Sequence, residues 1–177
     1  MPSQGNRMRL PIVLSVLFAV ALGTAHAANP PTLRVDIQHG GDAKTEHYAL
    51  ERVVVEPLPW PGHPARAIDA TNRGSQKFEV ADAASGRVLY SRGYSTVFGE
   101  WRTTDEAKGT QRSFQESLRF PMPDAPVRVT VFGRDAANAF APQWSVTVDP
   151  KGGGGERAGP GAAMETPAIR TRGGPRR

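Results

Sequence analysis

The sequence predicts an all-β protein whose folded part is an antiparallel β-sandwich of about seven strands. Apolar and polar residues alternate with a period of two in segment after segment, and clusters of Pro, Gly, Asn and Asp separate these segments, which is the pattern typical of a sandwich. Only one stretch has helix-forming character, and it is long enough for a single short turn. We assign the sandwich to residues 28–149, between a signal peptide at residues 1–27 and a disordered tail at residues 150–177.

The strands are predicted in order along the chain. In the first strand, apolar and charged residues alternate, as a half-buried strand requires: Leu33, Arg34, Val35, Asp36 and Ile37. Glycine-containing turns are expected at Gly40-Gly41 and at Ser85-Gly86. The remaining strands are predicted at Tyr48 to Val55, Phe78 to Val80, Val88 to Tyr90, Phe114 to Phe120, Val127 to Val131, and Trp144 to Val148, with Trp144 in the core.

Two stretches interrupt this alternation. Residues 57–64 read PLPWPGHP, and because proline has no backbone donor for a strand ladder, this stretch must be a loop or a sheet edge. Residues 103–108 begin with capping residues, followed by acidic residues and helix formers, which predicts one short helical turn.

The N-terminus is predicted to be a cleavable signal peptide. Arg7 and Arg9 precede an apolar run at residues 12–21, which is shorter than the roughly 20 residues of a spanning helix. Small residues at Ala25 and Ala27 place the cleavage after Ala27, and an uncleaved anchor is the alternative. We therefore expect an exported protein, periplasmic or secreted, with no stable membrane span. Since the chain has no cysteine, its fold must depend on packing alone.

The net charge of +5 does not indicate a nucleic-acid partner, because most of it lies outside the predicted domain. The signal segment carries a net +2 and residues 150–177 a net +4, which leaves residues 28–149 at −1. The tail is rich in Gly, Pro and Arg and has little apolar surface to bury, so we expect it to be disordered. A solubilising role is the simple interpretation, and attachment to an anionic envelope surface is the alternative.

No catalytic or metal site is strongly indicated, and we predict no cofactor. His39, Glu46 and His47, together with Asp42, lie close together around the Gly40-Gly41 turn and could gather around a cation, although turn polarity explains them equally well. A metal-dependent hydrolase using His39, Glu46 and His47 is therefore kept as an alternative. The sequence has no G-x-S-x-G motif and no H-E-x-x-H motif. The acidic side chains of the second predicted strand are expected to coat a solvated face: Glu46, Glu51 and Glu56.

Two tryptophans are candidates for binding. Trp60 lies in the proline-rich stretch, and Trp101 follows Glu100. An exposed pair of this kind could stack on a sugar ring or anchor a partner protein, and packing inside the domain is the alternative.

The order of several short runs resembles the N-terminal domain of the IgA-peptidase family of zinc metallopeptidases. The runs are TLRVDIQHGGDAKTEHYALERVVVEP, WPG, DATNRG, LYSRGYSTVFGEW, ESLRFPMPDAPVRV and RDAANAF, between residues 31 and 149. The resemblance implies a β-sandwich that precedes a separate zinc peptidase domain carrying an H-E-x-x-H motif. No catalytic residue can be carried over to this sequence, which contains no such motif.

The resemblance also directs attention to polar and aromatic residues inside the matched runs. These residues are Glu46, His47, Tyr48, Arg92, Glu100, Trp101, Glu116 and Arg119. They either brace the sandwich or form a surface that docks a peptidase domain or another partner. The resulting hypothesis is an exported, non-catalytic accessory or binding module for a peptidase domain, an envelope protein or a glycan, with Trp60, Arg92, Glu100 and Trp101 as binding candidates. An orphaned remnant of a longer peptidase is a further alternative.

Overall fold

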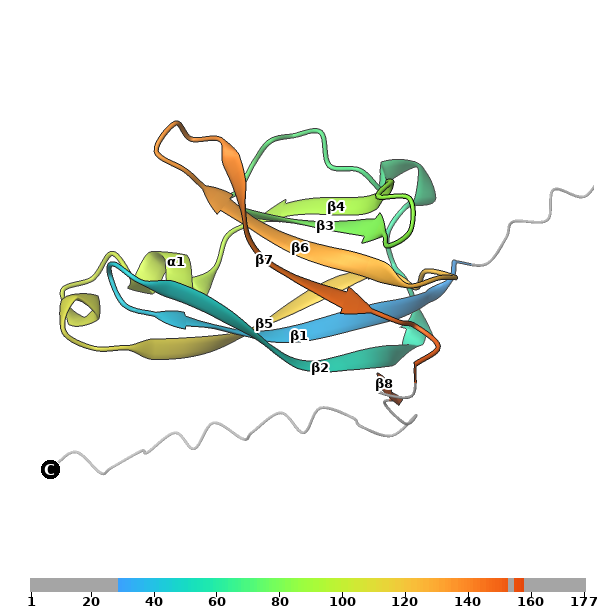
Figure 1. Cartoon of the computed structure of the whole chain (residues 1–177), viewed down its shortest axis with the longest axis horizontal. Helices are drawn as coiled ribbons and strands as arrows, with labels where there is room; N and C mark the ends of the chain where they lie inside the picture. Colours follow the sequence, from blue (N-terminus) through green and yellow to red (C-terminus); the bar gives the residue numbers. More distant parts are fainter. Residues whose placement is uncertain (1–28, 153–154, 158–177) are drawn as a thin grey trace, which may run out of the picture.

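The computed structural model describes residues 29–152 and 155–157, which form two facing β-sheets (Figure 1). Sheet A has the strand order β5-β1-β2-β8, and sheet B has the order β4-β3-β6-β7. The elements are β1 (Pro31–Gly41), β2 (Glu46–Pro59), η1 (Pro64–Arg66), β3 (Gln76–Asp82), β4 (Val88–Tyr94), α1 (Val97–Trp101), η2 (Glu106–Lys108), β5 (Arg112–Pro121), β6 (Val127–Arg134), β7 (Phe140–Val148) and β8 (Gly155–Arg157). The predicted all-β class and the antiparallel sandwich are confirmed.

The strand β1 lies in the centre of sheet A and pairs antiparallel with both β2 and β5 along its length. The turn from β1 to β2 is built on Gly41, whose φ of 142° disfavours residues with a side chain. Asp42 then closes the turn, because its carboxylate accepts hydrogen bonds from the backbone N–H groups of Lys44 (2.8 Å) and Thr45 (2.7 Å). The hairpin predicted around Gly40-Gly41 is present, but the two glycines end β1 and the turn itself lies at residues 42–45. The turn fixes the register between β1 and β2.

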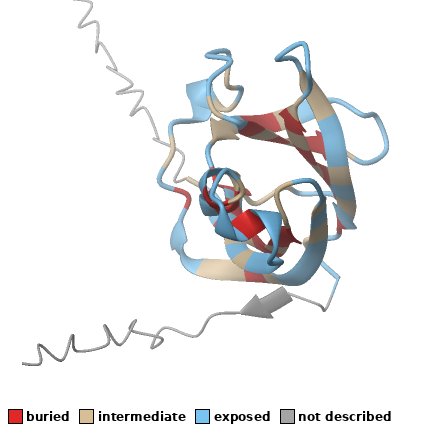
Figure 2. Cartoon of the chain, turned by 90° about the vertical axis from the view of Figure 1, so that its left-hand side faces the viewer, coloured by how far each residue is buried: buried red, intermediate tan, exposed pale blue. Residues whose placement is uncertain are grey.

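The core lies between the sheets, where the inward residues of both sheets meet. Figure 2, which views the molecule from the α1 end, shows the buried segments gathered between the two sheets. The strand residues of this core that are fully or nearly fully buried are Leu33, Val35, Ile37, Phe78, Val80, Tyr90, Leu118, Phe120, Val127, Val129, Val131 and Val148. They occupy the apolar positions of the predicted alternation. Trp144, predicted in the core, is half-buried and packs against this cluster from β7.

The helical segments are short and only partly as predicted. The turn expected at residues 103–108 is present as the 3₁₀ turn η2, whose Ala107 is buried. The helix α1 was not predicted. It begins because Thr96 caps it, with the side-chain oxygen of Thr96 accepting a hydrogen bond from the N–H of Gly99 (2.8 Å). Its five residues include a valine and a glycine, which are weak helix formers and obscure the signal.

The prolines of residues 57–64 lie where the sequence predicts an edge. β2 continues to Pro59, but β8 pairs with it only at residues 53–55, so Pro57 and Pro59 stand beyond that pairing. β8 itself was not predicted, because residues 155–157 fall in the segment expected to be disordered. Parallel pairing with β2 uses backbone groups and does not need apolar side chains.

The predicted signal peptide at residues 1–27 and residues 158–177 of the predicted tail lie outside the described residues. No helix among the described residues is long and apolar enough to span a membrane.

Candidate functional site

A histidine is buried at the inner face of sheet A, close to the turn between β1 and β2. The side chain of His39 is 0% exposed. Its Nδ1 lies 2.6 Å from Oε1 of Glu116 on β5, and its Nε2 lies 2.9 Å from Oε1 of Glu46 on β2. Both ring nitrogens are therefore bonded to carboxylates from the two strands that flank β1.

Further polar groups connect this histidine to the rest of the domain. We name the whole set the His39 cluster: His39, Glu46, Tyr48, Gln76, Tyr94, Phe98, Arg102 and Glu116. Oε1 of Glu46 also accepts hydrogen bonds from the Tyr48 hydroxyl (2.6 Å) and from Nε2 of Gln76 on β3 (3.0 Å). Arg102, which follows α1, donates from Nη1 to Oε2 of Glu46 (2.5 Å). Glu46 thus joins sheet A to sheet B and to α1.

Aromatic rings enclose the imidazole from two neighbouring elements. The ring of Tyr48 stacks on His39 with centroids 4.3 Å apart, and Phe98 of α1 lies 4.2 Å from it. The hydroxyl of Tyr94 on β4 completes the surroundings by donating to Oε2 of Glu116 (3.4 Å). A protonated imidazole is stabilised both by these rings and by the two carboxylates.

The cluster favours a charged histidine and an ionised Glu46. Burial opposes the charge on His39, but hydrogen bonds with Glu116 and Glu46 outweigh it and raise the pKa of His39 above its ordinary value. The hydrogen bond from His39, against the opposing effect of burial and with help from Tyr48 and Gln76, lowers the pKa of Glu46 to about 2. Burial, together with Glu46, raises the pKa of Tyr48, so its hydroxyl remains a donor.

These shifts predict how stability depends on pH. Because the pKa of His39 is raised in the folded state, protonation of His39 stabilises the fold. This stabilisation has its full value below about pH 6.5 and is lost as the pH rises through the folded pKa. Because the pKa of Glu46 is lowered in the folded state, ionisation of Glu46 also stabilises the fold. This stabilisation has its full value above about pH 4.5 and is lost as the pH falls towards 2. We expect the urea midpoint to be highest between these limits and to fall on the alkaline side. In His39→Gln the alkaline decline should shrink, and an unchanged decline would contradict this assignment.

The structure does not bring His39, Glu46 and His47 together as a metal site. His47 lies opposite Gly40 on the other face of β2 and is exposed, whereas Glu46 points inward and Nε2 of His39 is already bonded to it. No group of three side chains suited to a metal ion is present within residues 29–152 and 155–157. The expectation that Glu46 coats a solvated face is wrong, because strand alternation places it on the inner face, under Arg102.

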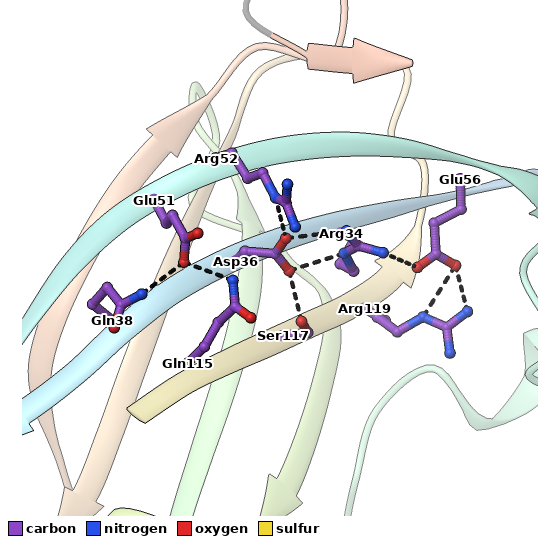
Figure 3. Close-up of polar contacts among 9 residues, drawn as sticks. All are labelled: Arg34, Asp36, Gln38, Glu51, Arg52, Glu56, Gln115, Ser117 and Arg119. Carbon is purple, nitrogen blue, oxygen red and sulfur yellow. Dashed lines mark hydrogen bonds and ion pairs between the residues drawn. The ribbon is translucent and has the colours of Figure 1, made fainter. Parts of the chain in front are cut away.

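The outer face of sheet A carries a second polar network, centred on Asp36 (Figure 3). Arg34 donates to both carboxylate oxygens of Asp36, at 2.9 and 3.1 Å. Arg52 donates from Nε at 2.7 Å, and the hydroxyl of Ser117 donates at 2.6 Å. The side chain of Asp36 is only 1% exposed. Burial opposes its ionisation, but these hydrogen bonds outweigh burial and lower the pKa of Asp36.

On the same face, one further glutamate on each side of Asp36 accepts hydrogen bonds from several side chains. Glu56 accepts from Nη1 of Arg34 (3.2 Å) and from Nε and Nη2 of Arg119 on β5. At the other end, Oε2 of Glu51 accepts from the side-chain amides of Gln38 (2.9 Å) and Gln115 (2.7 Å). We call the surface formed by Arg34, Asp36, Arg52, Glu56 and Arg119 the arginine face. The sequence predicts the polar character of this face but not the burial of Asp36.

Both tryptophan candidates are buried, which confirms the packing interpretation and leaves no exposed pair. Trp60 is 5% exposed and meets the ring of Tyr90 edge-on, with centroids 5.7 Å apart. Trp101 is 9% exposed, packs against Phe98 and Phe114, and donates from Nε1 to Glu106 (3.0 Å). The two rings belong to separate apolar clusters. Burial of these large rings removes them from solvent and leaves no face free for a sugar.

The other two binding candidates are exposed but lie on different elements. Arg92 is on β4, where its guanidinium donates to the Tyr90 hydroxyl from Nε and Nη2 (both 3.3 Å). Glu100 is on α1, next to the buried Trp101. Among the residues carried over from the resemblance, Glu46, Tyr48 and Glu116 meet in the His39 cluster, and Arg119 lies on the arginine face.

Comparison with known proteins gives one family match. The sequence model of a protein family described as Peptidase M64 N-terminus matches residues 25–145 of the chain. These residues include both the His39 cluster and the arginine face. No curated protein matches the chain.

Proposed function

Because the chain belongs to the Peptidase M64 N-terminus family, we propose that it is a non-catalytic accessory module that binds a protein partner. The observation that supports this most strongly is that the His39 cluster leaves no part of the imidazole accessible to a substrate or a metal ion. The only histidine placed beside two carboxylates in the described part of the chain is fully buried, with both nitrogens bonded. A general base must reach its substrate, and a metal ligand needs a free nitrogen. His39 instead joins β2 to β5 within sheet A, and its partners Glu46 and Glu116 extend the contacts to sheet B.

A protein is the partner that the geometry favours over a glycan. Stacking on a sugar needs an exposed aromatic face, and Trp60 and Trp101 are both buried. The arginine face, by contrast, offers charged donors held in place by neighbouring carboxylates, which is the chemistry of protein recognition. A peptidase domain of the same family and an exported envelope protein are the proposed partners, and export in turn depends on the predicted signal peptide.

The non-catalytic role can be tested on the purified full chain. We expect less than about a tenth of an equivalent of bound zinc or other transition metal by mass spectrometry, and no hydrolysis of a protein substrate after zinc is added. His39→Gln and His47→Ala should leave both readings unchanged. Close to one equivalent of zinc that is lost in either variant would support the hydrolase instead and refute the proposal.

A further inference from the structure

The charges of the arginine face are arranged in two layers. The carboxylates lie underneath, since the side chain of Asp36 is 1% exposed and that of Glu56 is 11% exposed. The guanidinium groups lie above them, with Arg34 25%, Arg52 44% and Arg119 49% exposed. The formal charges of the three arginines nearly cancel against the acids of the face, but the layer that a partner meets is cationic.

Two of these arginines have guanidinium nitrogens that donate no hydrogen bond to the other residues of the face. Arg34 donates hydrogen bonds from Nε and Nη2 to Asp36 and from Nη1 to Glu56. Arg52 bonds only through Nε, and Arg119 only through Nε and Nη2. Among the side chains of residues 29–152, both terminal nitrogens of Arg52 and Nη1 of Arg119 have no acceptor. A guanidinium fork of this kind matches a carboxylate more closely than any other protein group.

The donors are also fixed before any partner arrives. Arg52 is on β2 and Arg119 is on β5, with β1 between them (Figure 3). Two strand spacings of roughly 4.8 Å each and an offset of two residues along β1 separate the two arginines, so two carboxylates about 12 Å apart suit the pair. Because the buried acids already hold the two arginines, binding costs less side-chain entropy than it would for free surface arginines.

We propose that the arginine face docks an acidic segment of a protein partner, with Arg52 and Arg119 each binding one of its carboxylates. The inference rests on the proposed binding function and names the surface and the chemistry of the partner. A polyanionic partner held by long-range attraction fits less well, because residues 28–149 carry a net charge of −1. Recognition here is short-range and depends on guanidinium geometry.

The test uses the full chain and, as the probe, a fluorescent peptide that carries two glutamates in an otherwise neutral sequence. We expect saturable binding that weakens about tenfold for each of Arg52→Gln and Arg119→Gln. Arg128→Gln is the matched control, because Arg128 is an exposed arginine on the outer side of β6 in sheet B, and it should bind the peptide like the unaltered chain. Urea unfolding of each variant shows whether the fold is kept.

Lysine variants separate guanidinium geometry from charge. In Arg52→Lys the single ammonium replaces Nε at Asp36 and has no fixed fork left for the partner. Binding of the peptide should therefore fall nearly as far as in Arg52→Gln. Full binding by Arg52→Lys would refute the geometric part of the proposal.

The remaining outcomes distinguish this inference from the proposed function. Equal peptide binding by the unaltered chain and the folded Arg52→Gln/Arg119→Gln double variant would overturn the arginine face as the docking site. Binding to phosphatidylglycerol vesicles but not to the peptide would overturn a protein partner for this face. Neither result bears on the proposed non-catalytic role. That role would be refuted only if the chain bound stoichiometric zinc or hydrolysed protein.

Discussion

Replacing His39 with alanine is expected to lower the free energy of unfolding by about 3–5 kcal/mol. The substitution removes the positive charge between Glu46 and Glu116, whose side chains are only 19% and 11% exposed. It also empties the space between the rings of Tyr48 and Phe98. Two carboxylates would then face each other without the cation that both of them bind. Urea unfolding near pH 6 measures the loss.

The neighbouring histidine on β2 provides a matched control. His47 is exposed on the opposite face of the strand from Glu46, so His47→Ala should change the unfolding free energy by no more than about 0.5 kcal/mol. Equal effects of the two substitutions would show that the His39 cluster does not hold the sheets together.

Replacing Trp101 with alanine is expected to cost a similar amount, about 3–5 kcal/mol. The ring is 9% exposed and packs on Phe98 and Phe114, and its N–H bonds to Glu106. The truncation therefore leaves a cavity between α1 and β5 and removes the hydrogen bond to Glu106. Thermal or urea unfolding of the full chain provides the measurement.

An exposed residue of the same helix serves as the control for Trp101. Val97 is 64% exposed, so Val97→Ala should alter the unfolding free energy by less than about 0.5 kcal/mol. If Trp101→Ala left stability unchanged and removed binding of a partner, the ring would belong to an interface, and its buried position would be refuted.

The strands could be predicted from the sequence because their signal is local. Alternation at Leu33, Val35 and Ile37 reflects a property of each strand by itself, namely one apolar face. The same holds for the later strands, whose apolar positions are the buried ones. The helix α1 escaped prediction because its cap, Thr96, precedes residues with low helix propensity.

The candidate site could not be predicted because its contacts are not local. His39 meets Glu116, which is 77 positions away along the chain, and Gln76 meets Glu46 at a separation of 30. The register of β1 and β5 brings His39 to Glu116, and the packing of the two sheets brings Gln76 to Glu46. His39 was therefore grouped with its sequence neighbour His47, which faces the other way. Asp36 was placed correctly on a polar face, but its burial depends on arginines from β1 and β2 and a serine from β5.

The central place of β1 in sheet A has a consequence for the rate of folding. The strand is the first of the domain along the chain, and a tight turn connects it to its neighbour β2, so this pairing is local. Its other edge must wait for β5, because the pairing of residues 32–41 with residues 112–121 closes a loop of most of the domain. Long loops of this kind slow folding, so one edge of β1 should remain unpaired until β5 docks against it.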